Sequence, residues 1–102
     1  MAEVIVSENA DADLGRLVEF LAGQEPVAAL ATYDLLLGAL EVLRTYPSIG
    51  RPVDDDLREL VISRGETGYL ALYAYDVRMD RVLILAFRHQ REAGYLERDS
   101  IE

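Results

Sequence analysis

The spacing of apolar residues in the first 22 positions predicts a strand followed by a helix. The β-branched run EVIVS predicts a short strand over Glu3–Ser7. Apolar residues then recur every three or four positions from Leu14 to Leu21, which predicts a helix ending near Ala22. Ser7 offers a side-chain oxygen suited to the N-cap of that helix.

A second helical pattern follows at once. Gly23 ends the first helix and Pro26 opens the next, an arrangement typical of helix ends and starts. The second helix is predicted over Pro26–Tyr46, and so short a connection makes the two helices an antiparallel hairpin. Pro47–Asp56 carries Pro, Gly and three aspartates and is predicted to be an irregular loop.

The second half of the chain changes to the spacing of strands. Three apolar runs, Leu57–Ser63, Tyr69–Tyr75 and Arg81–Phe87, are separated by Gly-rich and Asp-rich turn signals. Such runs predict antiparallel strands joined by tight turns. The last run contains VLILAF, which is apolar on both faces and therefore predicts a strand inside the sheet.

These elements predict one α+β domain over residues 1–102, in the order β-α-α-β-β-β. The helical hairpin is expected to pack on one face of an antiparallel sheet of about four strands, which the N-terminal strand joins. The polar segment behind the last strand is expected at the rim of that sheet, where a rigid scaffold can support function.

Composition narrows the chemistry. The chain has no cysteine and one histidine, His89, which excludes disulfides and a cysteine nucleophile and leaves no metal-ligand spacing, so we expect neither a metal nor a cofactor. No apolar run approaches the roughly 20 residues that span a bilayer. The N-terminus lacks the basic and apolar regions of a signal peptide. We therefore expect a cytoplasmic protein with no membrane partner.

The charge favours a protein partner. The formal net charge is −9, and every basic residue is an arginine. So acidic a chain gains nothing from long-range attraction to nucleic acid. Arginine is also a better interface anchor than lysine.

The first candidate site lies behind the last strand and comprises Arg88, His89, Arg91 and Tyr95. RNA cleavage needs a base, an acid and cations around the phosphorane, and these four side chains could supply them. The alternative is a histidine at a strand end that is bonded to backbone or solvated. We favour this alternative, because a lone histidine without an assigned partner indicates little.

A second set of candidates, Arg51, Arg58 and Arg64, lies on and around the strand Leu57–Ser63 and could bind a target or a phosphate. The alternative for Arg58 is a cross-strand ion pair to Glu66 or Asp76.

Two further groups have structural readings that we prefer. Tyr69, Tyr73 and Tyr75 share one face of a strand and could stack bases, but such a row more often packs beneath helices. The Asp54–Asp56 run could bind a cation, but adjacent carboxylates in a loop are usually solvated.

The order of elements, with LRELVISRGETGYLALYAYD followed by VLILAFRHQREAGY, resembles the RelE/ParE superfamily of bacterial type II toxins. The resemblance covers most of the chain. It is most specific in the GRP loop, the LREL strand, the G-Y-x-x-x-Y strand and the final R-H-x-R.

The resemblance implies a toxin that a cognate antitoxin silences by wrapping its surface. ParE-like members are associated with inhibition of DNA gyrase, whereas RelE-like members cut messenger RNA on the ribosome. The ribonucleases place an arginine in the middle strand where this chain has Leu70, and they are strongly basic, so the ParE branch fits better.

We therefore expect a ParE-like toxin that acts by binding a protein target, with Arg51, Arg58, Arg64, Arg88, His89, Arg91 and Tyr95 as target-binding residues. The first alternative is a ribosome-dependent messenger RNA endonuclease that uses His89, Arg88, Arg91 and Tyr95. The second is a RelE-like binding module that is not toxic.

Overall fold

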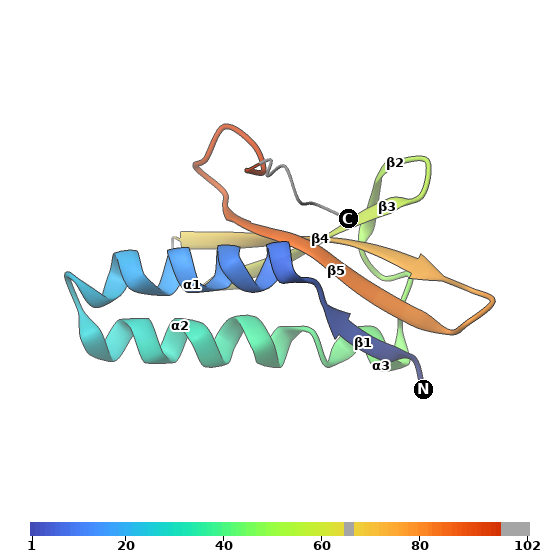
Figure 1. Cartoon of the computed structure of the whole chain (residues 1–102), viewed down its shortest axis with the longest axis horizontal. Helices are drawn as coiled ribbons and strands as arrows, with labels where there is room; N and C mark the ends of the chain where they lie inside the picture. The colour runs from blue at the N-terminus through green and yellow to red at the C-terminus, as the bar shows by residue number, and fades with distance from the viewer. Residues whose placement is uncertain (65–66, 97–102) are drawn as a thin grey trace.

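The computed structural model describes residues 1–64 and 67–96 of the chain. It consists of a mixed sheet with a helical layer on one face (Figure 1). Along the chain the elements are β1 (Glu3–Val6), α1 (Glu8–Ala22), α2 (Pro26–Ala39), α3 (Val42–Thr45), β2 (Arg51–Asp54), β3 (Leu57–Arg64), β4 (Thr67–Asp76) and β5 (Arg81–His89).

The sheet has five strands in the order β1-β5-β4-β3-β2. The predicted antiparallel meander is confirmed as β3-β4-β5, and β5 lies inside the sheet between β1 and β4. The expectation of about four antiparallel strands needs correction, because β1 pairs with β5 in parallel and β2 adds a fifth strand. The connection from β1 to β5 passes through the helices and then through β2, β3 and β4, and it is long enough to bring β5 alongside β1 in the same direction.

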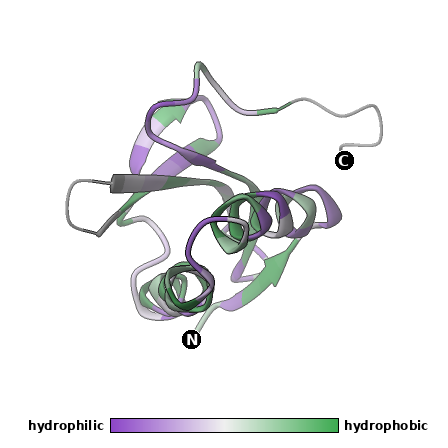
Figure 2. Cartoon of the chain, turned by 90° about the vertical axis from the view of Figure 1, so that its left-hand side faces the viewer, coloured by the Kyte–Doolittle hydropathy of each residue, from purple (hydrophilic) through white to green (hydrophobic). Residues whose placement is uncertain are grey.

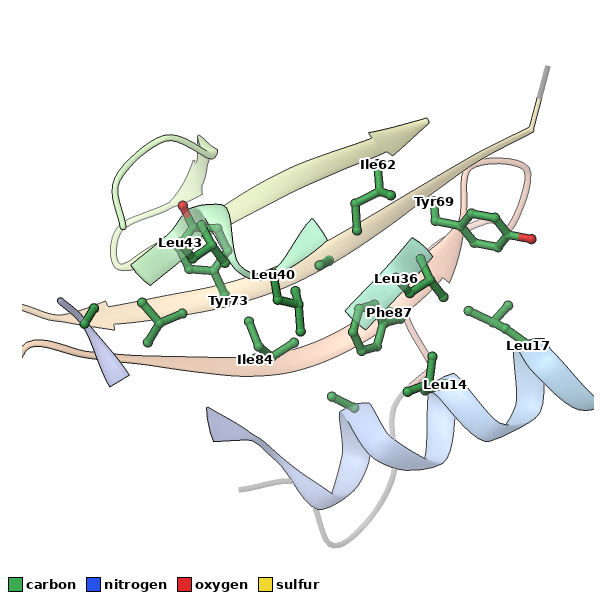
Figure 3. Close-up of a cluster of buried hydrophobic side chains, with 14 residues drawn as sticks. Leu14, Leu17, Leu36, Leu40, Leu43, Ile62, Tyr69, Tyr73, Ile84 and Phe87 are labelled. Carbon is green, nitrogen blue, oxygen red and sulfur yellow. The ribbon is translucent and has the colours of Figure 1, made fainter. Parts of the chain in front are cut away.

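The helical hairpin covers one face of the sheet, as predicted, and the hydrophobic core lies between them (Figure 3). Leu14 and Leu17 of α1 and Leu36 of α2 point toward the inner face of β4 and β5, where Phe87 is fully buried. Tyr69 and Tyr73 lie on the same inner face, so the packing interpretation of the tyrosine row is confirmed for both. Tyr75, at the strand end, is half-buried.

The start of α1 closes part of the sheet edge that β1 leaves uncovered. β5 has one extra residue, Leu85, opposite the step from Leu72 to Tyr73 of β4. The Leu85 carbonyl accepts hydrogen bonds from Ser7 Oγ at 3.3 Å and from Asn9 Nδ2 at 2.9 Å. Ser7 also caps α1, since its Oγ accepts the Ala10 N–H.

The second helix is shorter than predicted. α2 ends at Ala39, and a tight turn through Leu40 and Glu41 leads into α3. The N–H groups of these two residues donate to carbonyls three positions back, which is the 3₁₀ pattern. Gly38, a weak helix former, immediately precedes this change. The turn allows both Leu40 and Leu43 to enter the core (Figure 3).

The predicted loop Pro47–Asp56 contains a strand, β2, along the outer edge of β3. The sequence did not reveal it because all four residues are exposed and Pro52 interrupts the pattern. Before β2, Gly50 lies against Tyr73. Its N–H donates to the Tyr73 hydroxyl at 2.8 Å, and a Cβ on Gly50 would come within 2.7 Å of that oxygen. Glycine is needed here for close approach of the backbone.

The expectation that no segment is apolar enough to span a membrane was too strict. Pro26–Thr45, 20 residues that include α2 and α3, reaches a mean hydropathy of 1.5, sufficient by length and composition alone. In the fold one side of this segment packs on α1 and into the core, as Leu36 and Leu43 show.

Candidate functional site

A polar cluster lies on the face of the sheet opposite the helices, and Glu59 of β3 is at its centre. We call this surface the tail face, because residues 90–96 loop over it (Figure 1). Glu59 Oε2 accepts a hydrogen bond of 2.6 Å from the Tyr95 hydroxyl, and Oε1 accepts one of 2.9 Å from Arg51 Nε. The carboxylate is 6% exposed, so these partners replace its lost hydration.

Arg88 holds the C-terminal segment onto the tail face. Its Nη1 donates to the carbonyl oxygen of Glu92 at 2.8 Å and, more weakly, to those of His89 and Gln90 at 3.3 Å. Its guanidinium carbon lies 5.1 Å from the centroid of the Tyr95 ring, a cation–π distance. Arg88 and Tyr95 thus have structural partners already.

The pKa values follow from this packing. Burial by itself raises the pKa of Glu59, but hydrogen bonds from Tyr95 and Arg51 and the charges of Arg51 and Arg88 outweigh it. The pKa of Glu59 therefore lies below its ordinary value of 4.5. Burial, and then the Glu59 carboxylate, raise the pKa of Tyr95 above its ordinary 10.0. At neutral pH the phenol is a proton donor in a fixed hydrogen bond.

His89 lies on the other face of the sheet from Arg88, because successive side chains of a strand alternate. Its ring meets Tyr69 edge-on, with ring centroids 5.2 Å apart. Its Nδ1 accepts the backbone N–H of Arg91 at 3.0 Å. The structure thus gives His89 the backbone hydrogen bond of the interpretation that we favoured from the sequence.

A pocket of about 530 Å³ opens beside His89, between α1 and the end of β5. Its wall is mainly apolar and also contains charged and polar side chains. The lining residues are Arg16, Leu17, Phe20, Leu21, Tyr69, His89, Arg91 and Glu92. We call it the His89 pocket. Arg91 is exposed, and within the described residues it makes no ion pair.

Glu92 fixes one wall of the His89 pocket. Its carboxylate accepts a hydrogen bond from the backbone N–H of His89 at 2.8 Å and forms an ion pair with Arg16 at 2.8 Å. Burial raises the pKa of Glu92, but these hydrogen bonds and the charge of Arg16 outweigh it, and the net shift is downward. The buried Asp13 of α1 accepts the Phe87 N–H at 3.1 Å. Together with Ser7 and Asn9 it covers the part of the β5 edge that β1 does not reach.

The second group of candidate arginines is dispersed. Arg51 belongs to the tail-face cluster through Glu59. Arg58 donates to the carbonyl oxygens of Ser48 at 3.0 Å and Gly50 at 2.7 Å, so the interpretation of an ion pair with Asp76 is replaced by bonds to backbone. Glu66, its other candidate partner, and the side chain of Arg64 lie outside the described residues.

The structure therefore separates the predicted endonuclease set. Arg88 and Tyr95 lie on the tail face, whereas His89 and Arg91 line the His89 pocket on the helix side. Sequence reasoning missed Glu59 as a central residue, and it also missed Glu92, Leu17 and Phe20. For Glu59 the only signal in the sequence was an acid within an otherwise apolar strand. Within residues 1–64 and 67–96, no three acidic or histidine side chains converge as a metal site, Asp54–Asp56 included.

The fold is shared with chains of two solved toxin–antitoxin systems. A chain of the chromosomal ParDE toxin–antitoxin system from P. aeruginosa superposes with a TM-score of 0.72 at 20% identity, covering 85% of this chain and 94% of that one. The RelBE2 toxin–antitoxin complex from Mycobacterium tuberculosis contains a chain with a TM-score of 0.55 at 22% identity, with coverage of 89% and 93%. At such identities the likeness concerns the fold alone.

Sequence comparison gives the family. The family described as the ParE toxin of the type II toxin–antitoxin system parDE matches residues 4–94, so the chain belongs to this family and is a type II toxin. It is 35% identical to Toxin RelE3 of Caulobacter vibrioides over 92 residues, which are 90% of this chain and 98% of that toxin. It is 39% identical to Toxin RelE1 of the same organism over 70 residues, covering 69% and 75% of the two chains.

Proposed function

We propose that this toxin acts by binding a protein target, with DNA gyrase as the candidate that the ParE family suggests, and without chemistry of its own. A cognate antitoxin neutralises the toxin, as the toxin–antitoxin pairs among the similar solved structures suggest. Both proteins act in the cytoplasm. The observation that carries the proposal is the split between Arg88 with Tyr95 and His89 with Arg91 across the sheet. General acid–base catalysis needs its groups within hydrogen-bond reach of one substrate.

Three further features support binding over RNA cleavage. Arg88 and Arg51 are engaged with protein groups. Leu70, which stands where the ribonucleases have an arginine, is 3% exposed. The net charge of −9 opposes approach to a phosphate backbone. The His89 pocket, in contrast, combines a mainly apolar wall with aromatic side chains and two arginines, a composition typical of a protein-binding surface.

The second candidate function is a ribosome-dependent endonuclease, favoured by the names of the two Caulobacter relatives, RelE3 and RelE1. In that case Arg88 and Tyr95 would need to leave Glu59 and the tail carbonyls before they could meet RNA.

Induction of the chain in a bacterial host, followed by pulse labelling of DNA and protein, separates these functions. We expect growth to stop with DNA synthesis failing first, and co-expression of the antitoxin to restore growth. Failure of protein synthesis first, with cleaved transcripts, would establish the endonuclease instead. Unchanged growth would indicate a binding module that is not toxic.

A further inference from the structure

The His89 pocket has the size and the apolar lining of a site for a large side chain of a partner. Its volume of about 530 Å³ lies within the range of roughly 300–1,000 Å³ that ligand pockets occupy. Leu17 and Tyr69 line it from the same end of the core and are themselves nearly buried (Figure 3). Phe20, which also lines the pocket, is 68% exposed. An apolar side chain placed here would remove Phe20 from water.

The charges in the pocket wall are largely paired with one another. Arg16 is a hydrophilic residue of α1, a helix that shows both hydrophobic and hydrophilic colours when viewed toward its C-terminal end (Figure 2). It forms ion pairs with Glu92 at 2.8 Å and with Asp13 at 3.6 Å. The Glu92 carboxylate also accepts the His89 N–H. Arg91 is the lining charge that has no ion-pair partner within residues 1–64 and 67–96.

His89 adds a second hydrogen-bond donor to the pocket. Its Nδ1 accepts the Arg91 N–H at 3.0 Å, so the neutral ring carries its proton on Nε2. Nε2 forms no hydrogen bond within the described part of the chain. The polar groups available to a partner are therefore two donors, Nε2 of His89 and the guanidinium of Arg91, and the one carboxylate of the wall is already occupied.

This arrangement selects among partners. A basic segment would meet Arg91 without finding an unoccupied acid. A nucleic-acid strand brings one negative charge per nucleotide, whereas the pocket lining has two arginines and one carboxylate in a chain of net charge −9. A single carboxylate beside an apolar side chain matches both the donors and the wall. Its long-range repulsion by the acidic chain is screened beyond about 8 Å at physiological salt.

We propose that the His89 pocket receives a large apolar side chain of the protein target, and that an aspartate or glutamate next to it in the target pairs with Arg91. The apolar side chain packs against Phe20 and Tyr69, and the carboxylate accepts hydrogen bonds from Arg91 and from Nε2 of His89. The inference rests on the proposed function and specifies the kind of target segment that the toxin recognises.

A first test examines the chemistry of the pocket without the target. The isotope-labelled full chain is titrated by NMR at low salt with N-acetyl-Phe-Asp-amide and with its neutral match, N-acetyl-Phe-Asn-amide. We expect both to shift pocket resonances and the Asp dipeptide to bind about fivefold more tightly. This preference should disappear in Arg91→Gln and persist in Arg78→Gln, at an exposed position of the β4–β5 turn. N-acetyl-Ala-Asp-amide should bind at least about tenfold more weakly.

A second test connects the pocket to the target. Phe20→Ser removes the exposed apolar side chain of the pocket, and Val77→Ser is the matched control, at a position 74% exposed in the β4–β5 turn. Both positions are at the surface, and circular dichroism verifies that both variants fold. We expect inhibition of gyrase supercoiling to weaken about tenfold in Phe20→Ser and to change by less than about twofold in Val77→Ser.

Several results would overturn the inference. In the titration these are absent binding, equal affinity for the Asp and Asn dipeptides, a preference that Arg91→Gln retains, or tighter binding of uridine monophosphate in the same pocket. Unchanged gyrase inhibition by Phe20→Ser would also overturn it and would leave the proposed function intact. Absence of gyrase inhibition by the wild type would defeat gyrase as the target, and the dipeptide titration would still decide the chemistry of the pocket.

Discussion

The two faces of the sheet use the same strands but are held by different forces. On the helix face, Tyr73, Ile84 and Phe87 are fully buried among leucines, and burial of apolar area stabilises the packing (Figure 3). On the tail face a single acid, Glu59, is shared by Tyr95 and Arg51. The difference teaches that the helix face determines whether the chain folds, whereas the tail face positions a C-terminal segment.

The largest loss of stability is expected from truncating a buried side chain on the helix face. Phe87→Ala removes a fully buried ring from β5, the strand on which α1 packs. Such truncations cost about 3–5 kcal/mol, because a cavity adds to the lost transfer free energy. The free energy of unfolding in urea at neutral pH measures it. A loss below about 1 kcal/mol would mean that the helix face does not dominate stability.

A smaller effect is expected on the tail face. Glu59→Gln weakens the hydrogen bonds from Arg51 and Tyr95 and should cost about 1–2 kcal/mol, because Arg51 is largely exposed and its ion pair is screened. The free energies of unfolding of Glu59→Gln and Phe87→Ala, both measured in urea, show which variant loses more stability. An equal loss in both variants would contradict the contrast between the two faces.

The pH dependence identifies the source of that tail-face contribution. Since the pKa of Glu59 is lowered in the folded state, its stabilisation is complete above the unfolded value near 4.5 and is lost as the pH falls through the folded value. The difference between wild type and Glu59→Gln should therefore shrink below about pH 4.5. The pKa of Glu92 is lowered as well, so the stability of the variant still decreases somewhat in acid. A constant difference from pH 7 to pH 3 would exclude this linkage.

The smallest effect is expected at His89. The His89 ring contacts Tyr69 and accepts a hydrogen bond from the Arg91 backbone, and binding requires no proton transfer. His89→Ala should leave growth arrest largely intact and change stability by no more than about 1 kcal/mol. Induction of the variant at matched protein levels measures the arrest. Complete loss of toxicity in a folded His89→Ala protein would favour catalysis.

Much of the fold was predictable from periodicity, and the exceptions have physical causes. The meander and the helical hairpin follow from apolar spacing that burial enforces. β2 was missed because an exposed edge strand carries no alternation. The end of α2 was misplaced because the turn through Leu40 preserves the burial of Leu43, so the apolar spacing continues across it. The parallel pairing of β1 depends on the crossover and leaves no mark in EVIVS.

The candidate site was less predictable. The sequence identified Arg88, His89, Arg91 and Tyr95 but could not divide them between two faces, because that division depends on where β5 ends and how the tail turns back. The role of Glu59 depends on Tyr95, which is 36 residues away in the chain. No local pattern encodes such a contact.

The most direct test of the central claim is inhibition of purified DNA gyrase by the purified toxin, comparing wild type with Arg91→Glu and Arg78→Glu. Arg91 borders the His89 pocket, whereas Arg78 is exposed in the β4–β5 turn. The account predicts inhibition of supercoiling by the wild type, about tenfold weaker inhibition by Arg91→Glu, and wild-type inhibition by Arg78→Glu. No inhibition of gyrase, together with cleavage of ribosome-bound messenger RNA at substoichiometric toxin, would contradict it.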